Sequence, residues 1–318
     1  MGNVIKKHFH FNSSDGIHRI HGICWKPEEG DIKGVVQIVH GMNEFVDRYD
    51  DFARFLCAHG FVVAGEDHLG HGSSVNDESE LGFFGKKNGP DYLVQDNYRV
   101  KKHMEQEFSD VPYFILGHSM GSFITRLFLA RYSKEIDGAI IMGTGNQSQM
   151  MLYASKVLLR LMAIGKGWKF RSAFASKLAF GNYNKKYENV RTEYDWLTKD
   201  AAIVDAYIAN PLCTFTFTLA AFRDTSDMIA NAGKMDTILE MRKEMPVLIV
   251  SGKEDPVGGY GWGVEAVYKK FIEADMEDVT LKLYENDRHE ILNETDKDVV
   301  YEDILNWLTQ YIETEDEA

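Results

Sequence analysis

Cysteine, proline and long apolar runs are all scarce in this sequence. Its three cysteines, Cys24, Cys57 and Cys213, are far apart, odd in number and without the spacing of a metal site. We therefore expect buried or half-buried free thiols in a reducing compartment, and we predict a cytoplasmic location. No run of eighteen uncharged apolar residues occurs, which argues against a membrane span. The residues after Met1 form no apolar core, which argues against a secretory signal peptide.

Positive charge is also in short supply. The chain has 35 lysine and arginine residues against 49 aspartate and glutamate residues, and its formal net charge is -14. Such a surface repels a phosphate backbone, so we predict no nucleic-acid partner. Hydrophobic residues make up 44% of the sequence, as in an ordinary globular enzyme, which excludes disordered, collagen-like and repeat proteins. The oligomeric state has no signature in the sequence.

The order of the apolar segments predicts an α/β fold. The first thirty residues alternate on either side of a turn at Ser14 to Gly16, which predicts an antiparallel hairpin. The later strand-like segments are nearly continuous apolar runs, as is typical of strands buried on both faces. Alternation of such strands with helices requires a mostly parallel central sheet with helices on both faces. The predicted strands are 34–39, 61–64, 113–116, 137–142, 246–250 and 279–284, and the predicted helices include 49–58, 93–108, 123–132 and 300–311.

The alternation stops between Thr144 and Met245. That stretch is far longer than a crossover between parallel strands needs. Much of it has helical character, at 150–164, 170–180 and 200–209. We predict that residues 147–212 form a helical cap inserted into a core made of residues 1–146 and 213–318.

The sharpest chemical signal is Gly117-His118-Ser119-Met120-Gly121. It directly follows a predicted strand and directly precedes a predicted helix. A serine at such a turn adopts a strained backbone conformation that projects its hydroxyl above the sheet edge, and the two glycines relieve the crowding. Ser119 is therefore the candidate nucleophile, with Gly117 and Gly121 forming the elbow around it.

A serine nucleophile needs a base that is held in place by a third group. In an open parallel sheet these groups come from the carboxyl ends of later strands. His289 follows the last predicted strand and is the only histidine in the second half of the chain. Asp255 follows the preceding strand and is the preferred acid, because Pro256 fixes the turn after it. Glu254 and Asp287 are the alternatives.

The oxyanion that forms during acyl transfer needs two backbone donors. The elbow itself supplies the amide of Met120. The loop after the predicted strand 34–39 reads His40-Gly41-Met42, and the amide of Met42 is the candidate second donor. This chemistry requires no cofactor, and we predict none.

Several short motifs occur together and in register. In this combination the chain resembles the α/β-hydrolases of the monoacylglycerol lipase and lysophospholipase-like group, from about the first strand to the last helix. The resemblance implies the α/β-hydrolase fold, with Ser119 as nucleophile, His289 as base and Asp255 as its orienting acid. It also implies an oxyanion hole made of the Met42 and Met120 amides. The motifs are His40-Gly41-x-x-Glu44 with Arg48-Tyr49, Asp67-His68-x-Gly70-His71-Gly72-x-Ser74, the elbow, Asp255-Pro256 and Arg288-His289-Glu290.

We therefore predict a serine carboxylester hydrolase that cleaves single-chain acyl esters, monoacylglycerols first, through an acyl-enzyme. The same triad would serve a lysophospholipase, a general carboxylesterase or a thioesterase, because only the pocket discriminates among acyl groups. A non-catalytic ligand-binding protein on the hydrolase fold is the alternative of another class. Asn43 stands where the family has glycine, and Phe45 where histidine is common, so the preference for glycerol is open.

Two further groups of residues have competing interpretations. Asp67, His68 and His71 could hold a metal ion, but the glycines among them favour a turn, and we predict no metal. An apolar stripe in the predicted cap is explained equally well by packing on the core and by shelter for an acyl chain. Lys156 and Arg160 interrupt this stripe, so it could touch a membrane surface transiently without entering the bilayer. The stripe consists of Met150, Met151, Val157, Leu158, Leu161 and Met162.

Overall fold

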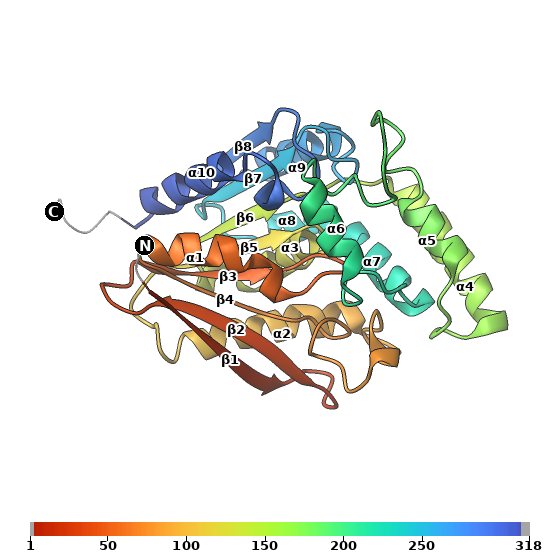
Figure 1. The fold of residues 1–318 in the computed structure, drawn as a ribbon, viewed down its shortest axis with the longest axis horizontal. Helices are drawn as coiled ribbons and strands as arrows, with labels where there is room; N and C mark the ends of the chain where they lie inside the picture. Colours follow the sequence, from red (N-terminus) through yellow and green to blue (C-terminus); the bar gives the residue numbers. More distant parts are fainter. Residues whose placement is uncertain (1–2, 313–318) are drawn as a thin grey trace.

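The computed structural model describes residues 3–312 as one eight-stranded sheet flanked by helices (Figure 1). The strand order is β1-β2-β4-β3-β5-β6-β7-β8. The strands are β1 (Val4–Asn12), β2 (Arg19–Pro27), β3 (Gly34–Val39), β4 (Phe61–Glu66), β5 (Tyr113–His118), β6 (Gly138–Met142), β7 (Val247–Gly252) and β8 (Val279–Tyr284). The α-helices are α1 (Asp50–Ala58), α2 (Gly89–Met104), α3 (Met120–Tyr132), α4 (Gln149–Lys166), α5 (Ala173–Phe180), α6 (Ala201–Ala209), α7 (Leu219–Ala232), α8 (Met235–Leu239), α9 (Trp262–Glu273) and α10 (Lys297–Gln310).

Most of the sheet is parallel, as the alternation of strands and helices predicts. β1 and β2 form an antiparallel hairpin at one edge, and β2 runs antiparallel to β4. All other neighbouring strands pair in parallel. The carboxyl ends of parallel strands meet at one edge of a sheet, so the loops after β3, β5, β7 and β8 converge there. The predicted fold class is confirmed.

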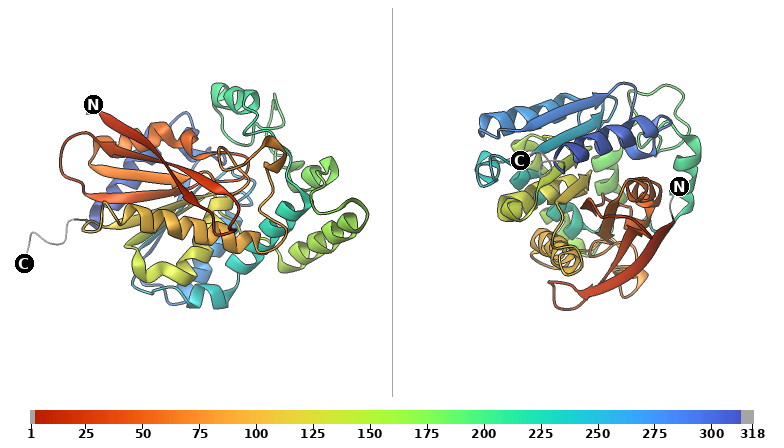
Figure 2. Two further views of the ribbon diagram at one scale, coloured as in Figure 1. Left: turned by 90° about the horizontal axis from the view of Figure 1, so that it is seen from below. Right: turned by 90° about the vertical axis from the view of Figure 1, so that its left-hand side faces the viewer.

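The residues of each central strand face two separate cores in turn. In β3, Val35 and Val39 pack in the core that includes α2, α3, α7 and α9, whereas Val36 and Ile38 pack in the core that includes α1 and α10. Figure 2 shows the helices on both sides of the sheet. This double burial is the physical reason for the continuous apolar runs in the sequence.

The chain between β6 and β7 contains five helices in place of a single crossover helix. The first three, α4 to α6, fall close to the helical stretches predicted within residues 147–212, and they lie to one side of the sheet (Figure 1). The next two, α7 and α8, were not predicted, nor was α9 between β7 and β8. α7 packs on α3 and on α4, so it links the core to the preceding helices. That residues 147–212 act as a cap stays a prediction.

The apolar stripe of α4 lies largely in solvent. Met150 is 80% exposed and Met151 is 65% exposed, whereas the buried face of the helix consists of Leu152, Leu159 and Ala163. Packing on the core is therefore the wrong explanation for the two methionines at the start of the stripe. Their exposure leaves an apolar surface on the outside of the predicted cap.

The three cysteines are free thiols, as the sequence predicts. Cys57 and Cys213 are buried and Cys24 is half-buried, and all three are free thiols. Burial raises the pKa of each thiol to about 12, which keeps it unreactive at neutral pH. Among residues 3–312, no helix has the length and apolar character needed to cross a bilayer.

Candidate functional site

Ser119 lies at the sharp turn between β5 and α3. Its φ of 54° and ψ of -118° form a backbone conformation that residues other than glycine seldom adopt. A Cβ added to Gly117 would lie 2.2 Å from Thr125 Oγ1, and one added to Gly121 would lie 1.9 Å from Val39 O. Only glycine fits at these two positions, for the steric reason that the elbow pattern implies.

His289 lies in the loop after β8, at the same edge of the sheet. Its Nδ1 lies 2.9 Å from Asp255 Oδ2, and Asp255 follows β7. Both side chains are buried. The Asp255 carboxylate also accepts hydrogen bonds from Ser251 Oγ at 3.1 Å and from the Val257 amide at 2.8 Å. With Nδ1 donating to this fixed carboxylate, Nε2 is the ring nitrogen left to face a nucleophile.

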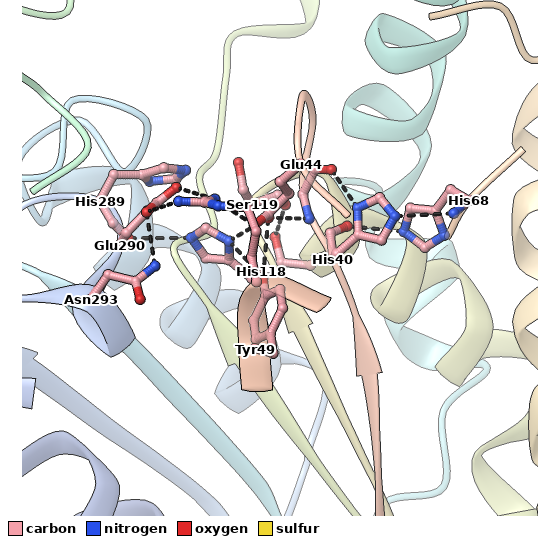
Figure 3. Close-up of polar contacts among 12 residues, drawn as sticks. His40, Glu44, Tyr49, His68, His118, Ser119, His289, Glu290 and Asn293 are labelled. Atoms are coloured by element: carbon pink, nitrogen blue, oxygen red, sulfur yellow. Dashed lines mark hydrogen bonds and ion pairs between the residues drawn. The ribbon is translucent and has the colours of Figure 1, made fainter. Parts of the chain in front are cut away.

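The two alternative acids are not bonded to His289. Asp287 accepts a hydrogen bond from Lys199 Nζ at 2.8 Å instead, and no hydrogen bond among residues 3–312 joins Glu254 to His289. Within residues 3–312, no hydrogen bond joins Ser119 to His289, and both side chains are drawn in the close-up of the site (Figure 3). The ring centroid of His289 lies 4.7 Å from that of His118, the residue before Ser119.

The loop after β3 approaches the elbow closely. A Cβ added to Gly41 would lie 2.9 Å from Ser119 Cβ. In the described chain, neither the Met42 amide nor the Met120 amide donates a hydrogen bond, so neither is already paired with another acceptor. Asn43 has a φ of 58°, in the left-handed region that glycine and asparagine adopt most readily. Asparagine can therefore occupy the position where the similar family has glycine.

A buried carboxylate holds this loop against the elbow. Glu44 Oε1 accepts a hydrogen bond from the Gly41 amide, and it also accepts one from the Tyr49 hydroxyl at 3.0 Å. His118 Nδ1 lies 3.0 Å from the same oxygen (Figure 3). One carboxylate thus joins the candidate oxyanion loop to the residue that precedes the nucleophile.

Arg48 extends these contacts to the histidine loop, which we define as residues 285–294. It donates to Glu44 Oε2 at 3.0 Å, and two parallel hydrogen bonds of 2.8 Å join its guanidinium to Glu290. Asn293 Nδ2 donates to Glu290 Oε2 at 2.9 Å, and His118 Nε2 lies 3.3 Å from the carbonyl oxygen of His289. The motifs that carried the family resemblance include most of these residues, but the sequence alone gave them no partners.

Charges stabilise one another within this network. Burial acts to raise the pKa of Glu44, but the neighbouring His118 and Arg48 hold that pKa well below its ordinary value. Burial acts to lower the pKa of His118, but the carboxylates of Glu44 and Glu290 raise it above its ordinary value of 6.5. The two shifts have opposite directions, and each favours the charged form of its group.

The histidine-rich loop after β4 does not bring the ligand atoms of Asp67, His68 and His71 close together. Asp67 Oδ2 accepts from His21 Nδ1 at 2.8 Å, and the His68 ring stacks on His40 with 3.9 Å between centroids. Burial lowers the pKa of His71 to about 3, which keeps its ring neutral. Asp67 and His68 thus have other partners. His40 connects this loop to the candidate oxyanion loop, because its Nδ1 lies 2.8 Å from the carbonyl oxygen of Gly41.

One other group of carboxylates in the described chain is close enough together to hold a metal ion. It consists of Asp287, Glu294 and Asp296. Lys199 Nζ already lies 2.8 Å, 3.8 Å and 3.7 Å from their oxygens, respectively. The lysine ammonium is therefore the cation of this cluster in the structure.

Comparisons with known proteins agree with this fold. A family profile described as "Serine aminopeptidase, S33" matches residues 30–296. The monoacylglycerol lipase of Mycolicibacterium smegmatis is 26% identical over 310 residues, which cover 95% of this chain and 96% of the relative. The monoglyceride lipase of Rattus norvegicus is 25% identical over 291 residues, which cover 91% of this chain and 86% of the relative. A carboxyl esterase from Bacillus coagulans, solved in complex with glycerol, has a TM-score of 0.89 and 28% identity, and the match covers 98% of this chain and 99% of the esterase.

Proposed function

The chain belongs to the serine aminopeptidase S33 family, and we propose that it cleaves monoacylglycerols through a triad of Ser119, His289 and Asp255. It is an ester-hydrolysing serine hydrolase of the monoacylglycerol lipase-like group. The observation that carries the triad is the 2.9 Å contact between His289 Nδ1 and Asp255 Oδ2, at the sheet edge where Ser119 occupies its elbow. The names of the relatives support monoacylglycerols as the substrate class.

Each residue of the proposed site has one task in the reaction. Ser119 attacks the ester carbonyl while His289 accepts its proton, and Asp255 holds the histidine ring in the required orientation. The amides of Met42 and Met120 donate to the oxyanion. His289 then protonates the leaving alcohol, and a water molecule repeats the sequence on the acyl-enzyme.

The alcohol side of the site is where the alternatives stay open. Phe45 packs against a small apolar cluster of Leu197, Tyr207 and Cys213, and so contributes an aromatic side chain between the candidate oxyanion loop and the helical segment. A larger head group would need more space beside Phe45 than glycerol does, and a simple alcohol would need less. The alternatives are accordingly a lysophospholipase and a general carboxylesterase or thioesterase with the same triad.

The proposed substrate is tested by hydrolysis of a chain-length series of monoacylglycerols and of lysophosphatidylcholines. The blank is the same enzyme inactivated with a fluorophosphonate, which also labels an active serine. We expect an optimum of kcat/KM on monoacylglycerols of one chain length. A higher kcat/KM on lysophosphatidylcholines would assign a lysophospholipase, and turnover of short activated esters alone would assign a general carboxylesterase. Absence of both labelling and turnover would assign a ligand-binding protein.

We also propose that the outer face of α4 contacts a lipid surface. Besides Met150 and Met151, Leu161 is 61% exposed and Ile164 is 78% exposed on this helix. An exposed apolar patch on a helix suits the interface of a bilayer, where an insoluble substrate is presented. The free thiols suit a reducing compartment, so we propose a cytoplasmic protein that reaches lipid from that side.

Replacing both Met150 and Ile164 by serine is expected to lower binding to phosphatidylcholine vesicles by about 30-fold, because about 2 kcal/mol of apolar burial is lost. Co-sedimentation with vesicles measures the binding. Turnover of a water-soluble short-chain ester is the control, and it should match the parent. Equal co-sedimentation of the variant and the parent would mean that α4 is not the contact surface.

A further inference from the structure

Two segments far apart in the chain are paired beside the proposed catalytic histidine. One is the histidine loop, and the other is residues 195–200, directly before α6, which we call the cap strap. The His289 amide donates to Trp196 O at 3.4 Å, and the Glu290 amide donates to Leu197 O at 2.7 Å. The Trp196 ring covers His289, with 5.1 Å between ring centroids. The proposed base is therefore held through its own backbone by the predicted cap.

Glu294 joins the same two segments through one carboxylate. It accepts the Arg288 amide at 2.9 Å and the Lys199 amide at 3.1 Å. Its side chain has no exposed surface. Burial raises the pKa of Glu294 above its ordinary value, although these backbone hydrogen bonds and Lys199 oppose that effect. Burying a carboxyl group costs solvation free energy, and the hydrogen bonds that Glu294 accepts from the two segments offset this cost.

Arg288 reaches across in the opposite direction. Its Nη1 donates to Asp195 O at 2.6 Å and to Thr198 O at 3.3 Å. Its guanidinium also lies 4.3 Å from the ring centroid of Tyr187, farther back in the segment between α5 and α6. In addition, Thr198 Oγ1 donates to Asn293 O at 3.0 Å. The residues on both sides of His289 are thus anchored to backbone groups of the cap strap.

We propose that Glu294 and Arg288 are positioning residues for His289, and that the cap strap and the histidine loop behave as one unit. The proposal rests on the proposed function of His289 as the base. Neither side chain needs to touch the substrate. Each fixes the backbone from which the imidazole extends, and a base displaced by about 1 Å from its productive position loses up to about 100-fold in rate. Any opening of the site then has to occur away from residues 195–200.

The test is Glu294→Gln, which keeps the size of the side chain but replaces one of its two acceptor oxygens by an NH₂ group, so that the Arg288 and Lys199 amides no longer each have an oxygen of their own. We expect kcat to fall about 10- to 100-fold while KM stays within about threefold of the parent. The midpoint of the pH profile of kcat/KM should shift, and the downfield NMR signal of the His289 Nδ1 proton should broaden or move. Glu285→Gln is the matched control, because Glu285 lies in the same loop but is exposed and, among residues 3–312, pairs with Lys253 alone. It should match the parent in all four readouts.

Two further measurements keep the outcome decisive. If Glu294→Gln does not fold, Arg288→Lys tests the same unit, since a lysine cannot donate to both carbonyl groups with the geometry of a guanidinium. A kcat within twofold of the parent in the folded variant, with an unchanged pH profile and NMR signal, would overturn the proposal. The rate of fluorophosphonate labelling of Ser119 separates this failure from failure of the proposed function. Labelling of the parent and the variant at equal rates removes only the positioning role, whereas an unlabelled parent removes the triad itself.

Discussion

The Ser119→Ala variant is expected to lose about a million-fold in kcat for ester hydrolysis, and Asp255→Asn about 10⁴-fold. Alanine has no oxygen to attack the carbonyl, so only substrate binding and the oxyanion amides would act on the reaction. Asparagine keeps the size of Asp255 but its NH₂ group favours the wrong tautomer of His289, whose Nδ1 now contacts the carboxylate at 2.9 Å. Steady-state turnover of a soluble ester and of a monoacylglycerol measures both losses.

Glu254→Gln is the matched control for these variants. Glu254 is the neighbour of Asp255, and the exchange makes the same change from carboxylate to amide. We expect its kcat within about twofold of the parent, as is usual for a substitution away from the reacting groups. Loss of turnover in Glu254→Gln, together with normal turnover in Asp255→Asn, would mean that Glu254 and not Asp255 is the acid that orients His289. Normal turnover in Ser119→Ala would remove the elbow from the site altogether.

The parts of the fold and site that the sequence could predict are those encoded locally. The elbow around Ser119 needs only a strand, a turn with two glycines and a helix, all of them contiguous. His289 and Asp255 could be found because parallel strands deliver their carboxyl ends to one edge, whatever the distance along the chain. The continuous apolar runs of the strands followed from burial on both faces.

The helix α7 could not be found in this way, because two local patterns compete before it. Residues 214–218 alternate threonine and phenylalanine, a period of two that is typical of a strand. In the structure this stretch forms only an isolated bridge, between Thr218 and Arg171, and Thr218 Oγ1 then caps the helix by accepting the Ala221 amide. The N-cap threonine before Leu219 was the available signal, and the preceding alternation obscured it.

The contacts among the buried charged residues near the elbow could not be predicted for a different reason. Glu44 meets His118 across 74 positions of the chain, and Arg48 meets Glu290 across 242 positions. Periodicity cannot pair charges over such separations, because each pair depends on the order of strands in the sheet. The motifs marked these residues as belonging together, but only the folded chain shows that the side chains of Glu44, Arg48 and His118 share one buried space.

This network leads to the second large effect, on stability. Glu44→Gln is expected to lower the free energy of unfolding by about 3–5 kcal/mol at pH 5.5, because it leaves buried cationic groups without their carboxylate. The loss should be smaller at pH 8.5. The pKa of His118 is raised in the folded state, so its contribution is complete below its ordinary value of 6.5 and disappears as the pH rises through the folded value. The pKa of Glu44 is lowered, so its contribution is complete above its ordinary value of 4.5 and disappears as the pH falls through the folded value.

These two pH dependences together predict that Glu44→Gln lowers the free energy of unfolding most between about pH 4.5 and pH 6.5. Urea unfolding of parent and variant at pH 5.5 and at pH 8.5 measures the difference. Asp51→Asn is the control, because Asp51 is exposed and its pair with Lys297 lies on the surface, so neither pH should show a resolvable loss. Part of the effect of Glu44→Gln should persist at pH 8.5, since Arg48 remains charged there and loses one of its two carboxylates. An equal loss at both pH values would mean that His118 is neutral in the folded protein, and that Arg48 alone accounts for the ionised state of Glu44.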